Sequence, residues 1–309
     1  MIKAPPTPKG FRDINPPLAK RRREVIGKIV DTLEKQEFGF VPIETPTIEF
    51  TDTLKGKYGE EGKLIYEFTD RGGRRLALRY DLTVPLARYV ATYNPPLPFR
   101  RYQIGQVFRG ENPQKGRWRE FTQLDFDSIG SNSLEEDAKI IMAAIKSVRS
   151  LGLKNAKMLI NDRFVFKGLK PEFIRAIDKL KKIGKDGVIA EIVINGADKN
   201  WAEKFIATFD KSKPTPNIIT LFEFLKDMQL VEGKDFEFDP TLARGLDYYT
   251  STIFELIPTG ESNDLSIGGG GRYDNLIGMF AKKDIPAVGF SFGLDRLIEL
   301  TSNNELSNT

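Results

Sequence analysis

Residues 108–121 read FRGENPQKGRWREF, and the prediction of the fold starts from this stretch. One strand is predicted to end at Arg109 and Glu111. After a polar loop that contains glycine, a second strand returns from Arg117 to Phe121. Arginine offers a planar fork for phosphate or carboxylate, glutamate accepts hydrogen bonds from an exocyclic amine, and phenylalanine stacks on a base. The hairpin therefore suits a bound nucleotide, although a surface hairpin with exposed charge has the same composition.

Two segments have the alternating pattern of a strand with one polar face. One lies before this hairpin and the other in its second strand. Residues 75–83 and residues 121–127 both alternate between apolar and polar side chains, as half-buried strands do. The polar faces hold Asp81 and Thr83 in the first segment and Gln123, Asp125 and Asp127 in the second. Two predicted strands thus present carboxylates on one side, which suits a binding platform.

Helical patterns alternate with further strand patterns. Asn15 and Pro16 open a predicted helix that reaches about residue 37. Ser133 and Glu136 have the spacing of a capping box for a helix to about residue 150. The later patterns are a strand at residues 156–161, lysine-rich helices at 162–234, strands with glycines at 241–271, and a strand running into a helix at 285–300. Because strands and helices come in runs rather than in strict alternation, we predict an α+β fold with a largely antiparallel sheet.

Composition limits the chemistry that the chain can perform. The 309 residues are 40% hydrophobic, enough for a sizeable core, and include neither cysteine nor histidine. This excludes disulfides, thiolate zinc sites, cysteine nucleophiles and Ser-His-Asp triads. Carboxylates, arginines, lysines, tyrosines or the substrates themselves must therefore carry any reaction.

The charge balance is compatible with a nucleic-acid partner without requiring one. There are 47 basic and 43 acidic residues, a net charge of +4. We interpret the basic run at residues 20–23 as the solvated face of a helix rather than as a tRNA contact. The chain has no apolar run long enough to span a membrane, and its proline-rich start lacks the apolar core of a signal peptide. We therefore expect a cytoplasmic protein without a membrane partner.

Several stretches resemble one family of enzymes. The hairpin at residues 108–121 resembles motif 2 of the class II aminoacyl-tRNA synthetases, and AVGFSFGLDR at residues 287–296 resembles motif 3. Residues 39–46 are similar to the looser motif 1. Within the class, LARGLDYYT at residues 242–250 is similar to a signature of histidyl-tRNA synthetases. Two more blocks match the same family, RYDLTVP at residues 79–85 and GGGRYD at residues 269–274.

The resemblance implies a catalytic core with an inserted helical domain. The predicted parts are a first section of the core with motifs 1 and 2 at residues 1–164, the insertion domain at 165–236, and a second section with the histidine signature and motif 3 at 237–309. The chain ends thirteen residues after Arg296. Typical members continue into an anticodon-binding domain of roughly one hundred residues, a normal domain size, so we expect that domain to be absent.

The resemblance also implies an ATP site. Arg109 is expected to contact the α-phosphate of ATP and the carboxylate of the amino acid. Glu111 is expected to accept from the adenine amine, and Phe121 to stack on the adenine. Arg117 and Arg296 are expected to hold the outer phosphates and the other side of the adenine. Mg²⁺ should accompany ATP and be carried by phosphates and water, so no metal site made by the protein alone is expected.

A histidine site follows from the same resemblance. The residues expected around histidine are Asp81, Thr83 and Gln123 for the ammonium group, Asp127 and Tyr249 for the imidazole, and Tyr248 and Arg244 beside them. Arg244 is also the expected catalytic residue together with Arg109, because adenylation needs neutralisation of developing negative charge and arginine does not titrate. A structural role for Arg244, in an ion pair with Asp247, is the alternative.

These implications favour a histidyl-tRNA synthetase core that forms histidyl-adenylate and transfers histidine to the acceptor end of tRNA(His). By resemblance, the first helix and the motif 1 strand are expected to build a two-fold homodimer. The alternative from another functional class is the histidine-sensing regulatory subunit of ATP phosphoribosyltransferase, which lacks the anticodon domain. That subunit is expected to lose nucleotide-binding residues, which this chain keeps. A module that only binds tRNA or protein is a third alternative, and it predicts binding without ATP turnover.

Overall fold

A mostly antiparallel sheet organises the chain. The computed structural model describes residues 5–113, 117–209, 212–245, 248–259 and 266–306. Within these ranges eight strands form the main sheet, in the order β1 (Val41–Pro42), β5 (Phe99–Phe108), β6 (Glu120–Ile129), β11 (Ala287–Gly293), β10 (Gly268–Arg272), β9 (Thr252–Pro258), β7 (Ala156–Asp162) and β8 (Phe236–Phe238). Only the outermost pairs, β1 with β5 and β7 with β8, are parallel. The predicted α+β class and the predicted hairpin are therefore confirmed.

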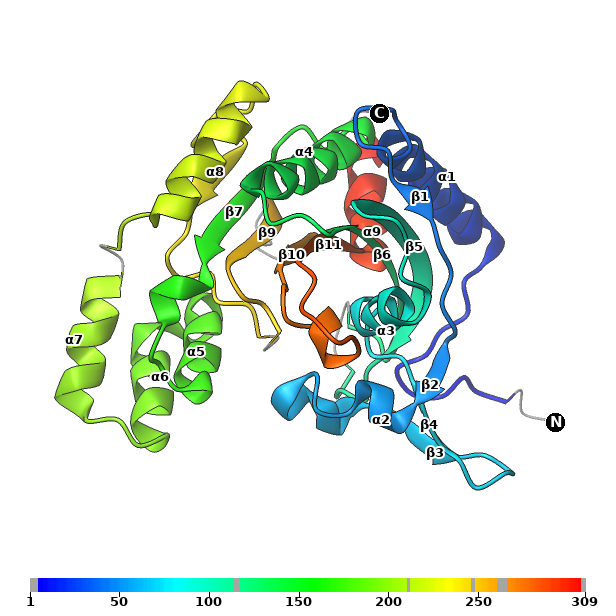
Figure 1. Cartoon of the computed structure of the whole chain (residues 1–309), viewed down its shortest axis with the longest axis horizontal. Coiled ribbons are helices and arrows are strands. Elements are labelled where there is room, and N and C mark those ends of the chain that lie inside the picture. Colours follow the sequence, from blue (N-terminus) through cyan, green and yellow to red (C-terminus); the bar gives the residue numbers. More distant parts are fainter. Residues whose placement is uncertain (1–4, 114–116, 210–211, 246–247, 260–265, 307–309) are drawn as a thin grey trace.

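One face of this sheet is apolar and covered by helices. The helices are α1 (Pro16–Leu33), α4 (Leu134–Ser150), α8 (Pro216–Asp227) and α9 (Leu294–Leu306), and Figure 1 shows the first three lying across the sheet. Alternate residues of β6 and β11, such as Leu124, Phe126 and Phe290, are buried in one core with them. Because side chains alternate along a strand, Gln123, Asp125 and Asp127 lie on the opposite face. This leaves a polar sheet surface for a site.

The segment 75–83 is a strand only in its first half. Strand β4 (Arg75–Leu78) joins β2 (Ile48–Phe50) and β3 (Glu67–Thr69) in a separate sheet, and helix α3 (Thr83–Tyr93) follows. The prediction of a strand to residue 83 is therefore wrong. Asp81 Oδ1 accepts a hydrogen bond from the backbone N–H of Val84 at 3.0 Å, and this local contact starts the helix instead of continuing the alternation.

The helix caps are only partly as predicted. Asn15 accepts from Leu18 N and caps α1, which ends at Leu33 rather than near residue 37. Ser133 accepts from Glu135 N at the start of α4. The capping box is wrong, however, because the Glu136 carboxylate turns to Arg100 on β5 instead of back to Ser133.

The basic run of the first helix divides between solvent and protein. Lys20 and Arg23 are exposed, as predicted. Arg22 is not, because it pairs with Asp295 at the start of α9 and donates to Thr122 Oγ1 on β6 at 2.5 Å. The interpretation of the run as a solvated face is wrong at Arg22, which ties α1 to the site-bearing strands.

A cluster of short helices lies to one side of the sheet, at the left of Figure 1. It contains α5 (Pro171–Asp178), α6 (Leu180–Ile194) and α7 (Lys199–Phe209), whereas α8 packs on α4 in the main core. The remaining short elements are α2 (Thr51–Leu54) and the 3-10 turns η1 (Gly59–Leu64), η2 (Arg163–Phe166) and η3 (Ile277–Met279). The division into parts 1–164, 165–236 and 237–309 stays a prediction. Among the residues described, no helix is long and apolar enough to cross a membrane.

Candidate active site

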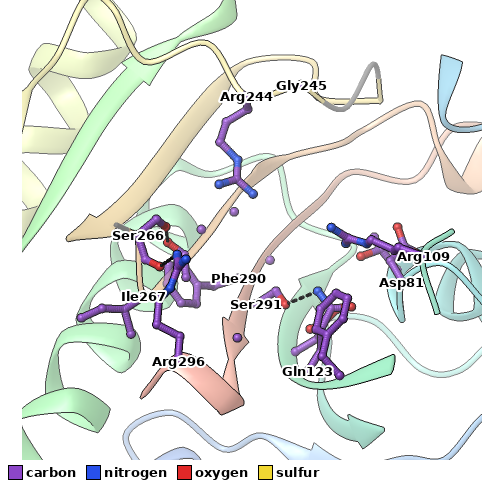
Figure 2. A pocket seen from close by; sticks show the side chains of 18 of the residues that line it. Asp81, Arg109, Gln123, Arg244, Gly245, Ser266, Ile267, Phe290, Ser291 and Arg296 are labelled. Atoms are coloured by element: carbon purple, nitrogen blue, oxygen red, sulfur yellow. Dashed lines mark hydrogen bonds between the residues drawn. The ribbon is translucent and has the colours of Figure 1, made fainter. Parts of the chain in front are cut away.

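A cavity of about 420 Å³ opens on the polar face of the main sheet. It lies between the β5–β6 hairpin, strands β10 and β11, the start of α3 and the segment that carries Arg244 (Figure 2). All twelve residues predicted for the site line its wall: Asp81, Thr83, Arg109, Glu111, Arg117, Phe121, Gln123, Asp127, Arg244, Tyr248, Tyr249 and Arg296. The fold thus brings together side chains that are up to 215 positions apart, from Asp81 to Arg296.

Arg109 is held between two aromatic rings at one side of the cavity. Its guanidinium carbon lies 4.4 Å from the centre of the Tyr80 ring and 5.0 Å from that of Phe121. Its Nε donates to the carbonyl of Tyr80 at 3.3 Å. Burial by itself lowers the pKa of Arg109, but Tyr80, Glu61 and Asp81 around it raise the pKa overall. Arg109 is therefore an oriented, permanent cation.

Two further arginines stand near the β5–β6 hairpin. Arg117 is 59% exposed, and its Nη1 lies 3.5 Å from Glu111 Oε2. Arg296 Nη1 donates to the carbonyl of Ser266 at 2.6 Å. Burial and the nearby Arg117 lower the pKa of Arg296, which means that a bound anion between the two guanidiniums relieves their repulsion. This arrangement suits a polyphosphate.

Arg244 reaches into the cavity from the opposite wall (Figure 2). Its Nη1 lies 3.2 Å from Glu255 Oε1. Its guanidinium lies so close to Gly269 that a Cβ there would overlap it. Burial lowers the pKa of Arg244, yet Tyr249, Glu255 and Asp178 raise it overall. Like Arg109, Arg244 is a fixed cation facing the site.

The backbone of Arg244 is in the left-handed region, with φ at 48°. Residues other than glycine, asparagine and aspartate adopt this conformation rarely and at a cost of about 1 kcal/mol or more. The surrounding structure must hold this segment in place for the side chain to face the cavity. The alternative partner Asp247 lies outside the described residues, whereas the ion pair with Glu255 lies within them.

Asp81 has hydrogen-bond donors on both carboxylate oxygens. Tyr58 donates its hydroxyl to Oδ1 at 2.8 Å, and Val84 N donates to the same oxygen at 3.0 Å. The Tyr248 hydroxyl donates to Oδ2 at 3.4 Å. Burial raises the pKa of Asp81, partly offset by these donors. The Asp81 carboxylate therefore holds Tyr58, Tyr248 and the start of α3 in place, and it also adds negative charge to the cavity.

Asp127 has a hydrogen-bond donor on one oxygen and an ion-pair partner at the other, and among the described residues its Oδ2 accepts no hydrogen bond. Arg101, which is fully buried, places Nη2 2.8 Å from Oδ2, and the Tyr273 hydroxyl donates to Oδ1 at 2.5 Å. Burial raises the pKa of Asp127, and Arg101 opposes that effect. A Cβ at Gly289 on the neighbouring strand would overlap the Asp127 carboxylate, so glycine is required there.

The remaining predicted histidine contacts line the same cavity. Gln123 Nε2 donates to Ser291 Oγ at 2.8 Å (Figure 2), and its Oε1 has no hydrogen-bond partner among the described residues. Tyr248 and Tyr249 pack with ring centres 4.9 Å apart. Thr83 shares a hydrogen bond with the Tyr248 hydroxyl. These side chains form a mixed polar and aromatic wall.

Sequence reasoning passed over several lining residues. Asp125 was placed on the correct strand face by alternation but was not chosen as a site residue. Tyr273 lies within the block matched to the family, and its hydroxyl contact with Asp127 was not foreseen. Glu61 in η1 and Asp178 at the end of α5 also line the cavity. No sequence signal points to these two, because elements distant in the chain bring them there.

Comparison with known proteins identifies what the chain is similar to. The family model described as Histidyl-tRNA synthetase matches residues 10–183 and 216–297. The histidine–tRNA ligase of Aeropyrum pernix is 42% identical over 324 aligned positions, which cover 96% of this chain and 74% of that protein. The unmatched residues 184–215 contain most of α6 and all of α7.

Solved structures agree with this similarity. The histidyl-tRNA synthetase from Nostoc sp. PCC 7120 superposes with a TM-score of 0.81 at 29% identity, covering 99% of this chain and 77% of that one. A Bacillus halodurans protein described as an ATP phosphoribosyltransferase regulatory subunit/histidyl-tRNA synthetase gives a TM-score of 0.80 at 23% identity, covering 97% and 84%. The second likeness shows the shared fold alone.

Proposed function

The chain belongs to the histidyl-tRNA synthetase family and carries the catalytic core of a histidine–tRNA ligase, and we propose that the cavity described above is where histidine is activated. The observation that carries this proposal is that fixed arginines and buried carboxylates meet in one cavity. Arg109, Arg244 and Arg296 come from three parts of the chain and line the cavity together with buried carboxylates. A zwitterionic amino acid and a polyphosphate together match that pattern.

In the first step the carboxylate of histidine attacks the α-phosphorus of ATP, and pyrophosphate leaves. The attacking group is already an anion, so no protein base is needed. Arg109 and Arg244 reduce the repulsion between carboxylate and phosphate and stabilise the negative charge of the transition state. Because both arginines are held by packing and ion pairing, little reorganisation accompanies the reaction.

The rest of the ATP molecule occupies the hairpin side of the cavity. Arg117 and Arg296 hold the outer phosphates, the Glu111 carboxylate accepts from the adenine amine, and the Phe121 ring stacks on the base. Mg²⁺ would accompany ATP, would be held mainly by phosphate oxygens and water, and would neutralise part of the phosphate charge.

Histidine lies over the polar face of β6 and the glycines of β10. Asp81, Thr83, Gln123, Asp127, Tyr248 and Tyr249 surround it. In the second step a ribose hydroxyl at the 3′ end of tRNA(His) attacks the carbonyl carbon of histidyl-adenylate, and AMP leaves. The regulatory subunit of ATP phosphoribosyltransferase remains the alternative, but the full set of nucleotide-side residues in this cavity favours the enzyme.

The decisive experiment is ATP–pyrophosphate exchange with each amino acid in turn. We expect exchange that depends on histidine and that falls by roughly 100-fold or more in Arg244→Ala, as for the loss of one fixed group that stabilises transition-state charge. Arg75→Ala is the matched control, because Arg75 is exposed and lies in the small sheet away from the cavity. Histidine binding without exchange would refute the enzyme and favour the regulatory subunit. Binding of tRNA alone would favour a platform.

We also propose that the protein acts in the cytoplasm as a two-fold homodimer formed by α1 and the motif 1 segment. Val41 on β1 and Ile48 and Phe50 on β2 are between 44% and 57% exposed. Burying these side chains against a second copy is favourable. Sedimentation equilibrium of the chain and of Phe50→Glu tests this, with a shift of the variant to monomer as the expected result.

A further inference from the structure

Glu61 is a carboxylate of the cavity wall that no step of the proposed reaction uses. It lies in η1, between α2 and β3 and outside the stretches that resemble the family motifs. Its Oε2 accepts a hydrogen bond from the Tyr80 hydroxyl at 2.5 Å. Tyr80 is fully buried behind the wall. Glu61 thus has one defined partner, and that partner is a residue that supports a catalytic group.

Tyr80 holds Arg109 by its ring and by its backbone. The Arg109 guanidinium lies over the Tyr80 ring at 4.4 Å, and its Nε donates to the Tyr80 carbonyl at 3.3 Å. The second ring against it, that of Phe121, is further away at 5.0 Å. The direction in which Arg109 enters the cavity therefore depends on where the Tyr80 ring lies.

The hydrogen bond to Glu61 acts on that ring in two ways. A bond from a hydroxyl to a carboxylate is short and strong, so it fixes the ring in one position. Burial raises the pKa of Tyr80, Arg109 opposes this, and Glu61 adds to the rise, so the hydroxyl keeps its proton and remains the donor. Donation to an anion also polarises the phenol and makes the ring face more negative, which strengthens its attraction for a guanidinium.

Both ends of η1 are attached to the same part of the site. At its end, the Leu64 carbonyl accepts a hydrogen bond from Gly110 N at 2.8 Å, directly after Arg109 in the chain. At its start, the Tyr58 ring packs on the Tyr80 ring with 4.8 Å between their centres. Glu61 lies between these two attachments, so its carboxylate is held at a fixed place relative to the hairpin.

We propose that Glu61 is a positioning residue for the activation of histidine, and that it acts through the Tyr80 hydroxyl, which holds the ring under Arg109. The proposal rests on the proposed function of the cavity. Without this hydrogen bond the ring and the guanidinium occupy the productive position for a smaller part of the time, and the rate of adenylation falls. A direct effect of the Glu61 charge on Arg109 is the competing explanation, because Glu61 also raises the pKa of that guanidinium.

A double-mutant cycle in ATP–pyrophosphate exchange tests this. The variants are Tyr80→Phe, which keeps the ring and removes the hydroxyl, Glu61→Ala, and the two together. We expect each single change to lower kcat at saturating histidine and ATP roughly 10-fold, the usual effect of losing a hydrogen bond to a charged group. The double variant should lose no more than either single variant, because both changes remove one interaction. Glu61→Gln should recover most of the rate, since its amide oxygen still accepts from the hydroxyl.

Rates are expressed per folded molecule, as measured by circular dichroism, so a loss of stability alone does not lower them. Glu67→Ala and Tyr93→Phe are the matched controls, because both side chains are exposed and absent from the cavity wall. They should exchange at the rate of the unmodified protein.

Three results would overturn the role of Glu61. Losses that multiply in the double variant would mean that Glu61 and Tyr80 act independently. A loss in Glu61→Gln as large as in Glu61→Ala would mean that the charge acts directly on Arg109. Unchanged rates in both single variants would show that the contact does not matter for the reaction. If the unmodified protein shows no exchange that depends on histidine, the proposed function itself fails, and this differs from all three.

Discussion

Replacing Asp125 with asparagine is expected to stabilise the ligand-free protein, and to do so increasingly as the pH rises. Burial raises the pKa of Asp125 from an ordinary value of 3.8 to about 7, with Asp127 and Asp81 adding to the effect and Arg101 and Ser291 opposing it. In the unfolded chain this carboxyl ionises near its ordinary pKa. Folding therefore disfavours the ionised form.

The size of the effect follows from the difference between the two pKa values. It amounts to about 3 units, and each unit corresponds to about 1.4 kcal/mol, so the full penalty is on the order of 4 kcal/mol. A raised pKa in the folded state means that the unmodified protein loses this stability as the pH rises from about 4 to about 7. Asparagine does not titrate, so the variant lacks this loss. Between about pH 5 and pH 7 the gap should widen by roughly 2 kcal/mol.

Groups from every neighbouring element belong to this titration. The charged groups are Arg79 after β4, Arg101 on β5, Asp127 on β6 and Asp81 before α3. Two tyrosines, Tyr249 and Tyr273, also interact with Asp125. They are present in both proteins, so their direct contributions cancel to first order in the comparison.

Urea denaturation of both proteins at several pH values measures the gap. The variant should match the unmodified protein near pH 4 and exceed it above pH 7, with the same denaturant slope. Asp186→Asn, at an exposed position on α6 that is absent from the cavity wall, is measured alongside as the control for replacing a carboxylate with an amide. A variant that is less stable at pH 8, or a gap that does not change with pH, would refute the reasoning, because it would mean that Asp125 is well paired in the folded state.

Three further changes test contacts that position the cavity. Gly289→Ala should abolish measurable histidine binding in calorimetry while leaving the protein folded by circular dichroism, since the added Cβ overlaps the Asp127 carboxylate; near-normal affinity would show that the strand can shift. Arg101→Met should lower the free energy of unfolding by about 3–5 kcal/mol in urea titrations, because Asp127 keeps a buried charge without its cation. Asp295→Asn should lower it by about 1–3 kcal/mol, since the carboxylate joins Arg22 on α1 to the start of α9, and an unchanged urea midpoint would contradict this.

The sequence predicted those parts of the site that depend on local pattern. Alternation along residues 121–127 placed Gln123, Asp125 and Asp127 on one face, and the hairpin was confirmed. Alternation failed at residues 75–83, because Asp81 bonds to Val84 N and starts α3. A period of two residues cannot reveal that competing local hydrogen bond.

Long-range contacts were beyond any pattern in the sequence. Arg22 was interpreted as solvent-facing from its neighbours in a basic run, yet its partner Asp295 lies 273 positions away. Glu61 and Asp178 reach the cavity from elements with no chemical motif. The hydrogen bonds that Asp81 receives from Tyr58 and Tyr248 were likewise not predictable, because only the folded chain brings these tyrosines to it.

The charges of the cavity also bear on why the reaction needs so few catalytic groups. If Asp81 and Gln123 hold the ammonium group of histidine, as proposed, the carboxylate of the same histidine is only two bonds further along and is repelled by Asp81 and Asp127. The guanidiniums of Arg109 and Arg244, which enter the cavity from opposite sides, attract it. The charge distribution then orients the nucleophile toward the α-phosphate. Asp81→Asn should for this reason lower the rate of pyrophosphate exchange at saturating histidine as well as the affinity, and an effect confined to the KM for histidine would show that the arginines orient the carboxylate without help from the ammonium contact.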